Sequence, residues 1–70
     1  MIIIRRNLET GIYSCRGTFQ NNDSFLNLMI EHNIDICQIT HSSFTVNISE
    51  ELIVIVKLSF PDVIDASNRN

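Results

Sequence analysis

The chain has 70 residues, of which 44% are hydrophobic and 19% are charged, and its formal net charge is -3. This length allows one domain at most, and the balance of apolar and charged side chains is typical of a globular protein. The small negative charge argues against a general nucleic-acid binder and against an acidic mimic of nucleic acid. No apolar run approaches the roughly 20 residues that cross a bilayer, so we expect a cytoplasmic protein with no membrane contact.

The first 19 residues predict a β-hairpin. Ile2–Arg6 opens with three β-branched residues, and Ile12–Phe19 alternates apolar and polar side chains, as strands with one buried face do. The connecting segment contains Gly11, which is suited to the positive φ angle that a tight turn requires.

A helix and two further strands are predicted next. The helix covers residues 23–32, because a polar segment containing Asn22 precedes apolar residues at helical spacing, and Asn33 is typical of a left-handed helix end. Ile34–Thr40 is apolar on both faces, which indicates a strand that is buried on both sides or contains a bulge. Residues 44–48 alternate strictly and predict a strand with one buried face.

Residues 50–58 are ambiguous. Ser49 followed by two acidic residues can begin a helix, whereas Leu52–Val56 is almost entirely β-branched and favours a strand. We expect the strand. The predicted fold class is therefore α+β, with a small antiparallel or mixed β-sheet in the order β-β-α-β-β-β and one covering helix at about 23–32. Residues 1–60 form the single domain of this prediction, and residues 61–70 form a polar C-terminal tail.

This layout predicts self-association. The expected last strand is apolar on both faces, with Ile53 and Ile55 on one of them. One short helix cannot bury both faces of a sheet, so we expect a homodimer in which Ile53 and Ile55 form the oligomer face. The alternative is a sheet that curls into a small barrel and buries its own inner face.

Residues 25–40 resemble the first helix and second strand of ACT-type regulatory domains. In both, an amphipathic helix ends at an Asn or Gly and runs directly into a strand of the pattern Ile-x-Ile-x-x-Ile. Residues 42–48 are placed like the third strand of that family, after which its members usually carry a second helix. The resemblance implies a small-ligand-binding regulatory module that pairs sheet edges and binds amino acids there, with residues 21–23 and 34–36 near the interface.

The sequence predicts no catalytic residue, metal site or cofactor. Cys15, Cys37, His32 and His41 lack the spacing of zinc ligands, and the two glycines do not form a phosphate-binding loop. Two cysteines cannot form a disulfide framework, and we expect both to be free thiols. We therefore expect a protein without enzymatic activity.

Charge is unevenly distributed along the chain. Residues 1–20 hold Arg5, Arg6 and Arg16 against one acidic residue, whereas residues 21–70 hold seven acidic residues against two basic ones. This polarity indicates a partner that recognises one sign of charge.

These observations favour a small protein–protein interaction module, such as an inhibitor, an adaptor or an assembly subunit, that acts as a homo-oligomer. We expect it to contact another protein through the three N-terminal arginines and through the acidic turn formed by Glu50 and Glu51. Two alternatives remain, namely ACT-like ligand binding and nucleic-acid binding through the basic N-terminal hairpin.

Overall fold

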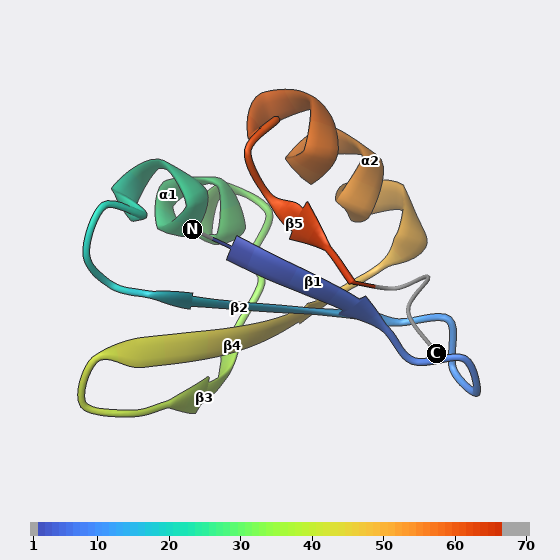
Figure 1. Ribbon diagram of the computed structural model, residues 1–70, viewed down its shortest axis with the longest axis horizontal. Coiled ribbons are helices and arrows are strands. Elements are labelled where there is room, and N and C mark those ends of the chain that lie inside the picture. The colour runs from blue at the N-terminus through green and yellow to red at the C-terminus, as the bar shows by residue number, and fades with distance from the viewer. Residues whose placement is uncertain (1, 67–70) are drawn as a thin grey trace.

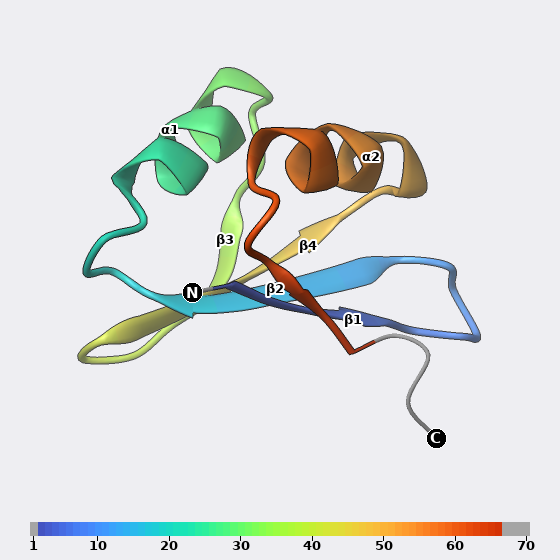
Figure 2. The ribbon, with the colours of Figure 1, turned by 45° about the horizontal axis from the view of Figure 1, so that its top comes forward.

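The computed structural model describes residues 2–66, which form one mixed sheet and two helices. In chain order the elements are β1 (Ile2–Arg6), β2 (Tyr13–Thr18), α1 (Asp23–Glu31), β3 (Ile36–Ile39), β4 (Ser43–Ile48), α2 (Glu50–Ser59) and β5 (Ile64–Asp65). The strand order in the sheet is β3-β4-β2-β1-β5, and both helices lie on the same face (Figure 1, Figure 2). The predicted α+β class is confirmed. No helix within residues 2–66 is long and apolar enough to span a membrane.

The predicted hairpin is confirmed. β1 and β2 pair antiparallel, and Ile4 lies opposite Cys15; both side chains are fully buried. In the turn between them Gly11 has a φ angle of +73°, which side chains with a Cβ rarely adopt. The hairpin therefore contributes Ile2, Ile4, Tyr13 and Cys15 to the buried inner face of the sheet.

The first helix and the fourth strand also follow their sequence patterns. α1 ends close to Asn33, whose φ angle of +57° is the left-handed conformation expected there. In β4 the alternating residues Phe44, Val46 and Ile48 are buried. β3 is shorter than expected and contains a register shift between Ile36 and Gln38, so the predicted bulge is present and burial on both faces is not.

The expected strand at residues 50–58 is wrong, because this segment is the helix α2. Ser49 caps the helix by accepting a hydrogen bond from the Leu52 amide at 3.3 Å, and Lys57 lies in the last turn. β-branched residues cost a helix only up to about 0.7 kcal/mol each. Burial of an aliphatic side chain contributes about 1.5–3 kcal/mol, and α2 buries Leu52, Ile53 and Val56. Tertiary packing therefore outweighs the local preference for a strand.

This helix also changes the expected oligomer face. Ile53 is 3% exposed because it packs in the core of its own chain, so it is not available to a second copy. Ile55 is 41% exposed on the same helix. The inner face of the sheet is covered by two helices of one chain, and a second copy is not needed to bury it.

Part of the predicted polar tail belongs to the sheet. β5 pairs parallel with β1, with Ile64 beside Ile3 and Asp65 beside Ile4. The Lys57 ammonium contacts the Asp65 carboxylate at 2.6 Å and so joins α2 to β5. Residues 67–70 of the predicted tail lie outside the described residues.

The topology brings two loops to one end of the sheet. From β2 onward the order β-α-β-β-α-β forms two split β-α-β units. In the first unit β4 lies between β2 and β3, and in the second β2 and β1 lie between β4 and β5. α2 occupies the position of the second helix that the ACT resemblance implies, but β1 is inserted between β2 and β5. Because β5 runs antiparallel to β2, the β2–α1 loop and the α2–β5 loop lie at the same end of the sheet.

Candidate functional site

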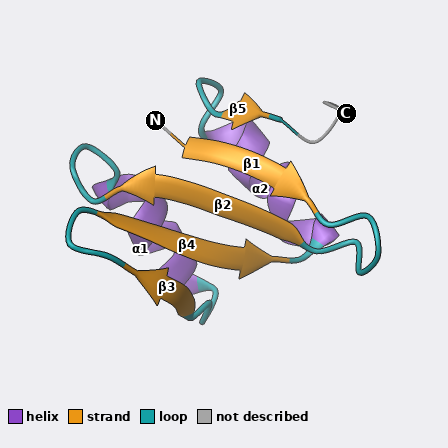
Figure 3. Ribbon diagram, turned by 60° about the horizontal axis from the view of Figure 1, so that its bottom comes forward, coloured by secondary structure: helices purple, strands orange, loops and turns teal. Residues whose placement is uncertain are grey.

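The face of the sheet opposite the helices is covered by no other part of residues 2–66 (Figure 3). Along β1, β2 and β4 its side chains alternate with those of the buried core. We call it the uncovered face; it consists of Ile3, Arg5, Ser14, Arg16, Thr18, Gln38, Ser43, Thr45, Asn47 and Ile64. Most of these residues are polar, as expected of a sheet face in contact with water.

Two arginines lie close together on the uncovered face. Arg16 is opposite Ile3 and Arg5 is opposite Ser14, so the two arginines occupy diagonal positions on neighbouring strands, about 7–8 Å apart. Both side chains are exposed. They line a shallow groove of about 330 Å³ together with Ile3, Ser14, Gln38 and Thr45. The groove therefore presents two adjacent guanidinium groups beside hydroxyl and amide groups.

Among residues 2–66, no carboxylate belongs to the uncovered face. The described acidic residues lie in loops, on the helices, or on the helix-facing side of β5; they are Glu9, Asp23, Glu31, Asp35, Glu50, Glu51, Asp62 and Asp65. Asp65 contacts Lys57, and the hydrogen bond between them raises the pKa of the Lys57 ammonium. The positive charge of Arg5 and Arg16 is thus not compensated on their own face.

Arg6 is separated from the other two predicted arginines. It lies opposite Tyr13, whose side chain is buried on the helix-facing side of the sheet. The Arg6 guanidinium carbon is 5.9 Å from the centroid of the Tyr13 ring, and the Lys57 ammonium is 6.0 Å from the same centroid. Arg6 therefore takes part in a cation–π contact within the chain.

Glu50 and Glu51 also lie away from the arginines. Both are exposed in the first turn of α2, where a negative charge interacts favourably with the helix dipole. They lie at the start of the helix, on the side of the sheet opposite the uncovered face (Figure 2).

The two cysteines lie in different environments. Cys15 is fully buried, and burial raises the pKa of its thiol to about 12, so it stays protonated and weakly nucleophilic at neutral pH. Cys37 is exposed, and its thiol donates a hydrogen bond to the Thr45 carbonyl at 3.2 Å. Within residues 2–66 no cluster of three or more His, Cys, Asp or Glu side chains is suited to hold a metal ion.

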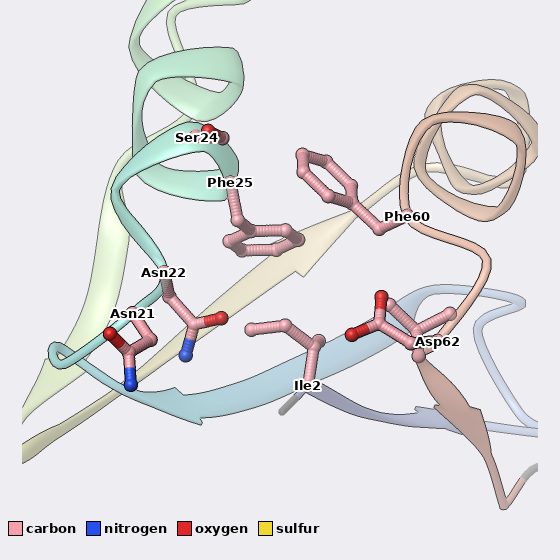
Figure 4. A pocket seen from close by; sticks show the side chains of 8 residues that line it. Ile2, Asn21, Asn22, Ser24, Phe25, Phe60 and Asp62 are labelled. Atoms are coloured by element: carbon pink, nitrogen blue, oxygen red, sulfur yellow. The ribbon is translucent and has the colours of Figure 1, made fainter.

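A second feature is a pocket of about 190 Å³ on the helix side of the sheet (Figure 4). Its walls come from the start of β1, the β2–α1 loop with the start of α1, and the α2–β5 loop. The residues are Ile2, Asn21, Asn22, Ser24, Phe25, Phe60, Asp62 and Val63. Sequence reasoning missed Phe60 and Asp62, because nothing along the chain indicates that the α2–β5 loop meets α1.

The two segments implicated by the ACT resemblance are not brought together. Asn21 and Asn22 line this pocket, whereas Ile34 lines a different one with His32 and Ser49, beyond the other end of α1. In comparisons with known proteins, no family model, no curated protein and no solved structure matched this chain.

Proposed function

We propose that this protein is a non-enzymatic interaction module that binds an acidic surface of a partner protein through the uncovered face of its sheet. The observation that supports this proposal is the pair Arg5 and Arg16, which no carboxylate on that face compensates. Arginine is enriched in protein interfaces and forms bidentate hydrogen bonds with carboxylates. Ile3 and Ile64 lie on the same face and supply apolar contact area beside the charges.

The chemistry of the uncovered face favours a protein over a single-stranded nucleic acid. Sequence-tolerant binding of single strands combines a basic groove with aromatic rings on which the bases stack. The aromatic residues within 2–66 are Tyr13 and four phenylalanines, and none of them belongs to the uncovered face.

The module acts as a homodimer in this proposal, through the outer side of α2. Val54 and Leu58 are one helical turn apart and are 55% and 79% exposed, and Ile55 lies beside them. These three residues, the α2 stripe, point away from the helix face that packs on the sheet. Exposed apolar patches of this kind mark sites of association. Two copies joined through the α2 stripe leave both uncovered faces accessible.

The first prediction concerns Arg5 and Arg16. We expect an oligoglutamate peptide to shift the amide resonances of β1, β2 and β4 in heteronuclear NMR spectra. The double variant Arg5→Gln/Arg16→Gln should bind at least about tenfold more weakly, because both charge-assisted hydrogen-bond donors are lost.

Arg6→Gln is the matched control, since it removes the same charged group from a neighbouring position that faces the helices. Arg6→Gln should weaken peptide binding only slightly, as the loss of one positive charge outside the uncovered face does. The amide shifts should stay centred on the uncovered face. The single variant Arg16→Gln allows a comparison at equal net charge. If Arg6→Gln and Arg16→Gln weakened peptide binding equally, only net charge would matter, and the proposal would fail. Tighter binding of a single-stranded oligonucleotide than of the peptide would favour the nucleic-acid alternative.

The second prediction concerns the oligomeric state. Light scattering at micromolar concentration should give the mass of a dimer for the wild-type chain and of a monomer for Leu58→Glu, because a charge in the α2 stripe is desolvated at the interface. Ile39→Glu is the control, since Ile39 is 64% exposed on β3 at the opposite edge of the sheet. A wild-type chain that is strictly monomeric would contradict the dimer without affecting the peptide-binding prediction.

A further inference from the structure

The pocket between the β2–α1 and α2–β5 loops carries an inference beyond the proposed function. It lies on the helix side of the sheet, away from the uncovered face, and it is enclosed by residues from three parts of the chain (Figure 4). A small pocket that combines apolar walls with a few convergent polar groups is the usual form of a ligand site.

Asn22 provides a buried side-chain acceptor with no hydrogen-bond partner among residues 2–66. Asn22 is 7% exposed, and its Nδ2 group donates a hydrogen bond to the Thr18 carbonyl at 2.7 Å. This hydrogen bond orients the amide so that Oδ1 is turned toward Ile2 (Figure 4). Asn22 precedes α1 but makes no side-chain capping bond, and within residues 2–66 its Oδ1 accepts no hydrogen bond. A buried acceptor in this state calls for a donor, and the pocket beside it gives a donor from outside the chain access to Oδ1.

Asp62 lies on the opposite wall and sets the charge of the pocket. Its carboxylate is directed toward Ile2 (Figure 4), and it is the single ionisable group among the lining residues. Asp23, in the first turn of α1, adds a second negative charge that offsets the positive end of the helix dipole. The pocket therefore favours a cation over an anion.

Two phenyl rings complete the site. Phe25 and Phe60 lie above Ile2 with their ring centroids 5.7 Å apart and their planes inclined by 60°. The faces of aromatic rings attract cations and also pack against apolar groups. The volume of about 190 Å³ limits the occupant to a small molecule.

We infer that this pocket binds a small organic ammonium ion. The ammonium group donates hydrogen bonds to Asn22 Oδ1 and to the Asp62 carboxylate, and the apolar body of the ligand lies against Phe25 and Phe60. A neutral alcohol of the same shape lacks the charge that pairs with Asp62, and a carboxylate is repelled by it.

The test is a titration with benzylammonium followed by heteronuclear NMR. We expect saturable shifts of the Asn22 side-chain amide and of the Ser24 and Asp62 backbone amides. Benzyl alcohol should bind at least tenfold more weakly than benzylammonium, and Asp62→Asn should weaken benzylammonium by a similar factor. Asp35→Asn is the matched control, because it makes the same change of charge in the α1–β3 loop and should leave the affinity unchanged.

The outcomes separate this inference from its rivals. Equal binding of benzylammonium and benzyl alcohol, tighter binding of benzoate, or an unchanged affinity in Asp62→Asn would each overturn it. A lysine side chain carries the same ammonium group, so a second titration uses lysine blocked at both its amino and carboxyl ends. Preference for benzylammonium assigns the site to a free amine, preference for blocked lysine assigns it to a peptide side chain, and binding of neither overturns the inference. None of these results depends on Arg5 or Arg16.

Discussion

Replacement of Phe25 by alanine is expected to lower the free energy of unfolding by about 3–5 kcal/mol. The Phe25 side chain is 1% exposed, and its ring centroid lies 5.8 Å from that of Phe44 and 5.7 Å from that of Phe60. The ring thus joins α1 to β4 and to the end of α2. A chain of this size has a total stability of roughly 0.05–0.15 kcal/mol per residue, so this loss removes a large part of it. Urea denaturation followed by circular dichroism measures the change.

Ile30→Ala is the control for this cavity effect. Ile30 lies on the same helix but is 71% exposed, so its truncation should change stability by no more than about 0.5 kcal/mol. A loss below about 1 kcal/mol for Phe25→Ala would contradict the packing of α1 against β4, because no tightly packed aromatic ring is removed at so small a cost.

Val54→Pro is expected to destabilise the fold by about 3 kcal/mol or more. Val54 lies in the interior of α2, where proline removes a backbone hydrogen bond and its ring clashes with the preceding turn. Its side chain is 55% exposed, so the loss reports on the backbone rather than on the core. Urea denaturation gives the magnitude, and far-UV circular dichroism gives the loss of helix.

Glu50→Pro makes the matched comparison. Glu50 is the first residue of α2 after the cap Ser49, and proline is favoured at that position because its missing N–H has no partner within the helix. We therefore expect a change of less than about 1 kcal/mol. Similar large losses at both positions would instead indicate the extended strand that the sequence favours.

The elements predicted correctly are those whose local signals agree with one another. In β4, Phe44 and Val46 alternate with polar residues, and every apolar member of that alternation is buried. The turn at Gly11 and the helix end near Asn33 are governed by the φ angles of single residues, which the residue type itself favours. Such features need no information from distant parts of the chain.

α2 is the opposite case. The mainly β-branched run at residues 52–56 favours a strand, whereas the capping residue Ser49 favours a helix, so the local signals leave the choice open. Packing decides it, because the half of the sheet formed by β1 and β2 needs a cover, and Val56 is fully buried in providing it. The capping residue can be recognised in the sequence. The surface against which the helix packs cannot, because distant strands form it.

The candidate sites divide in the same way. Alternation along β2 places Arg16 on the face of the sheet that points away from the core, and this could be predicted from the sequence. Its neighbour Arg5 and the isolation of Arg6 depend on the register of β1 against β2, since a shift of one residue exchanges the two faces. The pocket depends on more distant relations, because Asn22 and Asp62 line the same pocket although they lie 40 positions apart in the sequence.

The sequence by itself determined the α+β class, the N-terminal hairpin, the first helix and the strand beginning at residue 43, because each is governed by periodicity or by the φ preference of one residue. Only the tertiary structure decided that residues 50–59 are helical, that Ile53 belongs to the core of its own chain, and that Arg5 and Arg16 share a face without carboxylates. These features depend on contacts between segments far apart in the chain, whose free energies exceed the local preferences of any one of them.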